Sequence, residues 1–229
     1  MSALTTEPAA GGPTPATQPV QTSTSPLVRP NARAIATRFA FVAALIVLDL
    51  WSKSAVFAWM EGLESAGRLV PDDCGHGHLR MPIIDGWFTF MLSLNPGAAF
   101  GRLDSYPNLL IGGRIAAGLL LLWLLIRTPA TRPWLVVAFV LVLAGALGNL
   151  YDNLLRARDL ELDRYYRERT FGPVRDFVDV YFGVWKYHFP TFNVADSCIT
   201  VGAVVLLITS FAREKPAAVD SVAEPVSGA

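Results

Sequence analysis

Four stretches of this sequence are apolar over about the length that a helix needs to cross a bilayer. They are residues 39–59, 109–126, 134–151 and 194–211. A spanning helix takes roughly 20 predominantly apolar residues, because the hydrocarbon core is about 30 Å thick. In lipid such a segment must satisfy its own backbone hydrogen bonds, which a helix does. The sequence therefore predicts a membrane α-helical protein with four transmembrane helices.

The composition supports this class and excludes others. Charged residues make up 17% of the 229 residues, against about 25% in an ordinary soluble domain. The 19 basic and 19 acidic residues cancel, so we expect no nucleic-acid partner. With only two cysteines, Cys74 and Cys198, the chain is no disulfide scaffold and has no CxxC metal motif.

The two ends of the chain differ from the middle. Residues 1–34 are rich in Ala, Pro, Thr, Ser and Gly and have no apolar periodicity, so we expect a disordered tail and no secretory signal. Residues 214–229 form a second expected tail. The folded domain should therefore cover residues 35–213.

The segment between the first two spans is polar and contains one strand signal. Phe88, Phe90, Leu92 and Leu94 recur at every second position, which predicts a half-buried strand over residues 86–94 on the membrane surface. The same segment contains Cys74, followed by two histidines in the sequence CGHGH. A metal site is one interpretation, but so few ligands in a Gly-rich loop favour solvated loop residues.

Two of the spans carry features that an apolar helix does not need. In the first, Asp49 and Lys53 are four residues apart with the acid first, which favours an ion pair on one helix face. This pair either only tolerates the membrane or serves a function. In the second, Gly112, Gly113 and Gly118 suggest close helix packing.

The basic residues near the spans predict the topology. Four spans put both termini on one side, together with Arg and Lys residues at 29, 33, 38, 127, 132, 213 and 215. The positive-inside rule assigns that side to the cytoplasm. The opposing loop after the third span carries seven basic residues as well, interleaved with acids. The β element and surface loops should then be extracytoplasmic.

Residues 173–197 concentrate acids directly before the fourth span. Asp176, Asp179 and Asp196 lie there, and an ionisable group near a bilayer is a functional-site candidate. Asn193 and Asp196 also fit a helix start, as N-cap and third helical residue. From this stretch alone, structural capping competes with catalysis.

The topology decides between these interpretations. Asp152 ends the third span, where an anion opposes the helix dipole and needs a partner such as Arg156 or a functional role. Asn95, Asp152, Asp176 and Asp196 all come out near the outer face in the predicted topology. This convergence favours catalysis over capping.

Five motifs in this arrangement resemble the lipoprotein signal peptidases (signal peptidase II), a family of membrane aspartyl proteases. They are Asp49-x-x-x-Lys53, Asn95-x-Gly97-Ala98-Ala99-Phe100, Gly148-Asn149-x-x-Asp152, Val174-Arg175-Asp176-Phe177 and Phe192-Asn193-x-Ala195-Asp196-Ser197. Each motif is weak alone. Five in the family's order, at the right places of a four-span pattern, are a specific signal.

The resemblance implies the roles of the motif residues. Asp176 and Asp196 would be the catalytic aspartates, whereas Asp179 does not match a catalytic position. The residues expected to bind substrate or shape the site are Asp49, Lys53, Asn95, Gly97, Ala98, Asn149, Asp152, Asn193 and Ala195. The chain departs from the family at Asn153, where an Arg is usual, and Arg156 or Arg175 could substitute. The link from the third motif to Asp176 is also unusually long.

The resemblance also implies the reaction. Two nearby carboxylates share a proton, so one can activate a water while the other protonates the leaving group, without a metal or cofactor. The implied substrate is a bacterial prolipoprotein, cut before a cysteine that carries diacylglyceryl. The expected protein is a monomer of the inner membrane, in contact with lipid. The alternatives are a small proton-coupled transporter using Asp49, Lys53 and Asp196, and a non-catalytic scaffold with capping aspartates.

Overall fold

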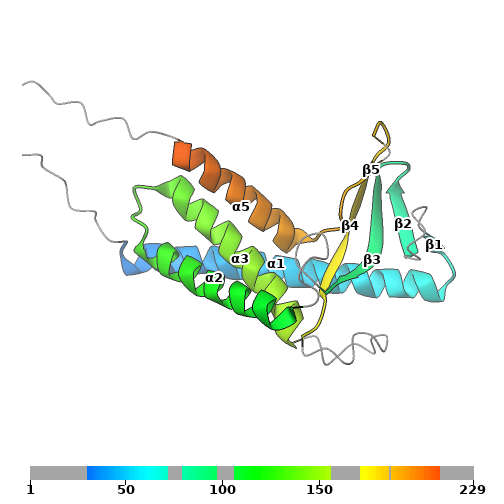
Figure 1. Ribbon diagram of the computed structural model, residues 1–229, viewed down its shortest axis with the longest axis horizontal. Coiled ribbons are helices and arrows are strands. Elements are labelled where there is room, and N and C mark those ends of the chain that lie inside the picture. The colour runs from blue at the N-terminus through cyan, green and yellow to red at the C-terminus, as the bar shows by residue number, and fades with distance from the viewer. Residues whose placement is uncertain (1–29, 72–78, 97–105, 156–170, 186, 212–229) are drawn as a thin grey trace, which may run out of the picture.

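The fold is a helical bundle with a sheet at one end (Figure 1). The computed structural model describes residues 30–71, 79–96, 106–155, 171–185 and 187–211. In this part, four helices are long and apolar enough to cross a membrane. They are α1 (Ala32–Ser65), α2 (Pro107–Arg127), α3 (Pro133–Leu155) and α5 (Val194–Phe211). The membrane α-helical class is therefore confirmed, while the expected tails lie mostly outside the described residues.

The helix α3 is the centre of the bundle. Of its apolar window 44% is buried, against 17% in each of the other three helices, and it packs against all of them. The core cluster joins α1, α2 and α3 through Val42, Leu125, Phe139, Val140, Leu143 and Ala144. Because α3 contacts every partner, side chains near its end can meet groups from the whole bundle.

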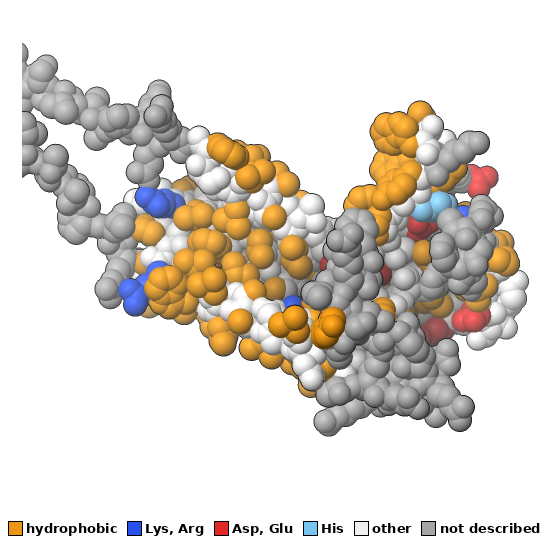
Figure 2. Space-filling model, in the orientation of Figure 1, with side chains coloured by type: hydrophobic (Ala, Val, Ile, Leu, Met, Phe, Trp, Pro, Cys, Tyr) orange, Lys and Arg blue, Asp and Glu red, His pale blue; other side chains and the backbone are white. Residues whose placement is uncertain are grey.

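The outer faces of the helices are apolar as well. Val47, Trp51, Leu119 and Leu207 are each more than half exposed. Figure 2 shows hydrophobic side chains covering most of the visible face of the bundle, with Lys and Arg side chains at the end away from the sheet. A soluble protein rarely exposes so large an apolar surface, so lipid is the medium that suits it.

The helix α1 is longer than a single span. It has 34 residues, begins after the N-cap Asn31 and runs on beside the sheet, where Trp59 meets the ring of Phe90 edge-on. It ends at Ser65, and two residues later Gly67 has a left-handed φ of 64° and donates its N–H to the carbonyl of Glu64. The extra turns link the bundle to the sheet.

Close helix packing occurs at other glycines than expected. A Cβ at Gly112, Gly113 or Gly118 would meet nothing within 4 Å, so the prediction for the second span is wrong. A Cβ at Gly148 would instead lie 2.5 Å from the Oδ2 of Asp49, and one at Gly145 would overlap the carbonyl of Ala195. A Cβ at Gly202 of α5 would likewise lie 2.6 Å from the side chain of Val142 of α3, so the close approaches all involve α3, the central helix.

The sheet is antiparallel, and its strands are in sequence order. They are β1 (Val70–Pro71), β2 (Leu79–Ile84), β3 (Phe88–Asn95), β4 (Val174–Phe182) and β5 (Tyr187–His188). The expected strand over residues 86–94 corresponds to β3. The strand β2 was not expected; it contains Pro82 and shifts register directly after it. Proline counts against a strand, which explains the omission.

Strand pairing places the acidic stretch beside the bundle. Ser93 of β3 lies opposite Asp176 of β4, after a register shift between Phe90 and Ser93. On the other side of β4, Phe192 exchanges backbone hydrogen bonds with Val178. This second pairing brings the start of α5 next to β4.

Candidate active site

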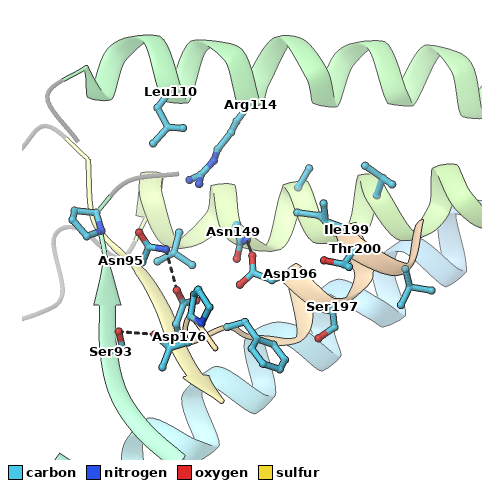
Figure 3. A pocket seen from close by; sticks show the side chains of 18 of the residues that line it. Ser93, Asn95, Leu110, Arg114, Asn149, Asp176, Asp196, Ser197, Ile199 and Thr200 are labelled. Atoms are coloured by element: carbon cyan, nitrogen blue, oxygen red, sulfur yellow. Dashed lines mark hydrogen bonds between the residues drawn. The ribbon is translucent and has the colours of Figure 1, made fainter. Parts of the chain in front are cut away.

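Asp176 and Asp196 line the same cavity, which has a volume of about 1000 Å³. Asp176 comes from β4, and Asp196 from the first turn of α5. Figure 3 shows both carboxylates at one end of this cavity, close to Asn149 and Asn95. Both aspartates are thus placed where a ligand in the cavity could reach them.

Asn193 connects the two aspartates directly. Its Nδ2 donates to the Oδ1 of Asp176 at 2.7 Å, and its backbone N–H donates to the Oδ2 of Asp196 at 3.1 Å. Asn193 itself is fully buried. A buried side chain with these bonds holds the two carboxylates in a fixed relation to each other.

The helix-capping interpretation is confirmed as well. The Oδ1 of Asn193 accepts from the backbone N–H of Asp196 at 2.9 Å, and Asp196 returns the bond described above. This reciprocal pair is a capping box, which satisfies N–H groups that the first turn leaves free. Capping and exposure to the cavity coexist in Asp196, so one role does not exclude the other.

Two further asparagines bind the aspartates. Asn149 of α3 donates from Nδ2 to the Oδ1 of Asp196 at 2.8 Å. Asn95, the last residue of β3, donates from Nδ2 to the Oδ2 of Asp176 at 3.1 Å. Each aspartate therefore accepts hydrogen bonds at both of its oxygens.

The environment of Asp176 changes its acidity. The pKa of Asp176 is raised to about 7, mainly by burial and to a smaller extent by the nearby charge of Asp196. The hydrogen bonds from Asn95 and Asn193 and the charge of Lys53 oppose this change. Asp176 therefore retains its proton to near neutral pH, as an acid catalyst requires.

Four buried charges lie behind the aspartates. Lys53 contacts Asp49 at 2.8 Å, as the spacing predicted, and also Asp152 at 3.3 Å. Asp152 in turn binds Arg175 at 2.7 Å. The partners of Asp152 are therefore Lys53 and Arg175, while Arg156 lies outside the described residues. Two cations and two anions neutralise one another, which lowers the cost of burying them.

Asn149 connects this charge network to the aspartates. Its Oδ1 accepts from Lys53 at 2.9 Å and from Asn193 at 3.1 Å. Asp49 also accepts from the backbone N–H of Ala195 at 2.9 Å, at the start of α5. The expected site-shaping residues Asp49, Lys53, Asn149, Asp152, Asn193 and Ala195 thus form one connected group with the aspartates.

The remaining residues of interest lie elsewhere. Gly97 and Ala98 are outside the described residues, as are Cys74 and both histidines of the CGHGH sequence. Asp179 accepts from the Oγ1 of Thr89 at 2.8 Å and lies 3.3 Å from the Nδ1 of His188. Asp179 does not line the cavity.

One cation of the site was not predicted from the sequence. Arg114 of α2 lines the cavity, and Figure 3 shows its guanidinium extending from the helix toward the aspartates. It donates to the side-chain oxygen of Asn153, the position at which the sequence departs from the family motif. Arg175, one expected substitute, is committed to Asp152 and does not line the cavity. A charged residue inside an apolar span was the signal that could have identified Arg114.

The rest of the cavity is largely apolar and is bounded by three helices. Its apolar lining includes Leu110, Ala117 and Leu121 of α2, Val142 and Ala146 of α3, and Ile199 and Val201 of α5. A volume near the upper end of the usual range for ligand pockets fits a large, partly apolar ligand. Two linked carboxylates at one end could act on a polar group of that ligand.

Known proteins are similar to this chain in sequence. The signal peptidase (SPase) II family model matches residues 41–212. A lipoprotein signal peptidase from Alteromonas mediterranea is 32% identical over 83% of this chain and 90% of its own length. One from Syntrophus aciditrophicus is 39% identical over 60% of this chain and 78% of its own.

A solved structure of a bacterial membrane enzyme is also similar. The match covers 80% of this chain and 94% of the chain in that structure, with a TM-score of 0.55 and 25% sequence identity. Sequence and fold thus agree over most of the helical bundle and the sheet. This chain belongs to the signal peptidase II family.

Proposed function

We propose that this protein is an aspartic endopeptidase that removes signal peptides from prolipoproteins, with Asp176 and Asp196 as its catalytic pair. Its relatives are named lipoprotein signal peptidases. The observation that carries the aspartic chemistry is the pair itself: two carboxylates at one end of a large cavity, joined through Asn193. Asp49, Lys53, Asn95, Asn149 and Asp152 support the pair.

The different surroundings of the aspartates suggest their roles. Asp176, whose pKa is raised to about 7, begins the reaction with the proton. Asp196 begins as the base and takes a proton from a water as the water oxygen bonds to the scissile carbonyl carbon. Asp176 then gives its proton to the amide nitrogen as the bond between that nitrogen and carbon breaks, and the proton that Asp196 took from water leaves the pair with one shared proton again. Overall, one water is consumed, and a carboxylic acid and an amine are formed.

The cavity suits a lipidated substrate. Its apolar lining can accept acyl chains, while the peptide bond lies at the carboxylates near the sheet. The cleaved bond would directly precede a cysteine carrying diacylglyceryl, whose chains need not leave the membrane. Because the bilayer already keeps these chains out of water, the cavity would bind them through van der Waals packing and without a hydrophobic gain over lipid.

The buried charges favour a protease over a transporter. In the described part of the chain, Asp49, Lys53, Asp152 and Arg175 pair with one another and connect to the aspartates through Asn149. A proton relay needs ionisable groups at successive depths, whereas these groups contact one another in a single cluster. Capping alone does not account for the bonds from Asn149 and Asn95.

The proposal includes the location of the protein. Residues 35–213 would form a multi-pass domain of the inner membrane, a monomer with both termini in the cytoplasm and the site at the extracytoplasmic face. In support, the start of α1 and the end of α5 lie together at the end of the bundle opposite the sheet (Figure 1). The helix α1 already begins at Ala32, so the domain starts a few residues before the expected residue 35. The residues at 214–229 would be a tail outside this domain.

Purified protein and a synthetic lipopeptide test the proposal. The wild type should cleave a diacylglyceryl-modified peptide before the modified cysteine and leave the same peptide without lipid largely uncut. Mass spectrometry of the two products identifies the bond. Cleavage at another residue, or equal cleavage of the peptide without lipid, would contradict the proposed substrate class.

A further inference from the structure

Arg114 is a cation in an otherwise apolar wall of the cavity. Its neighbours on α2 that line the cavity are Leu110, Ala117 and Leu121. A guanidinium within a spanning helix costs several kcal/mol unless polar groups receive it. Arg114 is half-buried, and its charge is close enough to act on both Asp176 and Asp196. Its position in the wall therefore calls for a role in the site.

Asn153 fixes the direction of this side chain. Arg114 donates to the Oδ1 of Asn153, and the Nδ2 of Asn153 donates to the carbonyl of Gly172 at 2.7 Å. Asn153 is only 2% exposed, so its amide is held on both sides. The contact joins α2 to α3 and directs the guanidinium into the cavity (Figure 3).

We propose that Arg114 is a substrate-binding residue whose guanidinium, anchored by Asn153, donates hydrogen bonds to a carbonyl oxygen of the lipidated substrate. This inference rests on the proposed function. It assigns a substrate contact to Arg114, in the wall of the cavity that α2 forms. In a lipidated peptide, the groups near the cleaved bond that can accept from a guanidinium are ester and peptide carbonyls. Hydrogen bonds from a charged donor are the stronger kind, and a low-dielectric wall strengthens them further.

Replacing the donors tests the contact. Arg114→Met keeps length and apolar character but removes every N–H group. We expect it to raise KM for the diacylglyceryl peptide about 10- to 100-fold, the usual value of a hydrogen bond to a charged group, with a much smaller change in kcat. Arg114→Lys, which retains a charge and donors, should recover part of the loss.

Arg127→Met is the matched control. Arg127 lies on the same helix, in its last turn, and stacks over Trp123 at 5.4 Å without lining the cavity. KM should stay at the wild-type value in this variant. An equal rise in KM for Arg127→Met and Arg114→Met would trace the effect to α2 as a whole and overturn the proposal.

Two substrates identify the accepting carbonyl. A dialkylglyceryl peptide has ether links and so lacks the ester carbonyls. If Arg114 binds an ester, Arg114→Met should raise KM only for the diacyl substrate. If it binds a peptide carbonyl, the rise should be the same for both. An unchanged KM for both substrates would overturn the proposal.

Asn153→Ala tests the anchor. It should raise KM in the wild-type background but change it little in the Arg114→Met background, because the two residues act through one contact. Independent effects that multiply would show that Asn153 does not act through Arg114. Thermal unfolding of each variant in detergent checks that the helices remain folded.

Two further measurements distinguish substrate binding by Arg114 from an effect on the aspartates alone. If Arg114 acted only on the charge of the aspartates, Arg114→Met would lower kcat and shift the pH profile at constant KM, and substrate binding would be the wrong role. Equilibrium binding of fluorescent diacylglyceryl peptide should weaken by the same factor as KM rises. A wild type that binds this peptide without cleaving it would contradict the proposed function, while the binding comparison would still test Arg114.

Discussion

Asn193 donates from Nδ2 to the Oδ1 of Asp176 at 2.7 Å, while its own Oδ1 caps the helix that carries Asp196. One fully buried amide thus both begins α5 and orients an aspartate on a different element. The two tasks use different atoms of the side chain. Substitutions can therefore separate them.

Asn193→Asp should keep the cap and impair the chemistry. Aspartate is as good an N-cap as asparagine, but it offers no donor to Asp176 and adds a third carboxyl group beside the pair. We expect cleavage to fall at least about 10-fold, the value of one hydrogen bond to a charged group. Asn193→Ala removes the cap as well, so the free energy of unfolding should fall by about 1 kcal/mol. Normal cleavage by Asn193→Asp would show that the bond to Asp176 is dispensable.

The catalytic pair is tested by neutral replacements. Asp176→Asn and Asp196→Asn should insert, fold and bind lipopeptide but cleave none, because an amide can neither take a proton from the attacking water nor give one to the leaving group. Asp196→Asn keeps an oxygen for the capping box, so its structural cost should be about 1 kcal/mol.

Asp179→Asn is the control from the same strand as Asp176. Asp179 contacts Thr89 and His188 outside the cavity, so this variant should keep substantial activity. Near-normal cleavage by Asp196→Asn, measured from the initial rate of product formation, would leave Asp196 with the capping role alone.

The pH profile should reflect the acid form of Asp176. Burial and the charge of Asp196 raise the pKa of Asp176 to about 7, so the free enzyme loses this proton as the pH rises through that value. We therefore expect kcat/KM for the lipopeptide to fall above about pH 7. A kcat/KM that keeps rising well beyond pH 7 would assign the required proton to another group.

Gly148 tests how tightly α3 packs against α1. A Cβ at this position would lie 2.5 Å from the Oδ2 of Asp49, so Gly148→Ala must displace the pair that Asp49 forms with Lys53. We expect a loss of about 1–3 kcal/mol and reduced cleavage. Gly112→Ala is the control, because a Cβ there meets nothing within 4 Å. Thermal unfolding in detergent should show a lower Tm only for Gly148→Ala.

Reporter fusions test the proposed topology. The start of α1 and the end of α5 lie at the same end of the bundle (Figure 1), and the positive-inside rule assigns that end to the cytoplasm. A reporter that works only in the cytoplasm should therefore be active when fused after Lys215, and one that works only outside should be inactive. A second fusion, in the link between α3 and β4, should show the opposite behaviour. Extracytoplasmic activity of the fusion after Lys215 would reverse the orientation.

The sequence by itself determined the parts of this protein that depend on short windows of chain. Apolar length predicted the four membrane helices, although α1 (Ala32–Ser65) extends well beyond the expected residues 39–59 at both ends. Spacing gave the pair of Asp49 and Lys53, and the residues before α5 gave its cap. These features follow from helix geometry and from hydrogen bonds within one turn, so neighbouring residues are sufficient to specify them.

Only the tertiary structure decided which distant residues meet. The partners of Asp152, the contact of Arg114 with Asn153, and the bonds from Asn149 and Asn95 all join different elements. No local period encodes such contacts, because they depend on how α3 packs among its neighbours and on the register of β3 with β4. The cavity likewise exists only between packed helices. The size of the cavity and the presence of Arg114 in its wall are therefore properties of the folded chain.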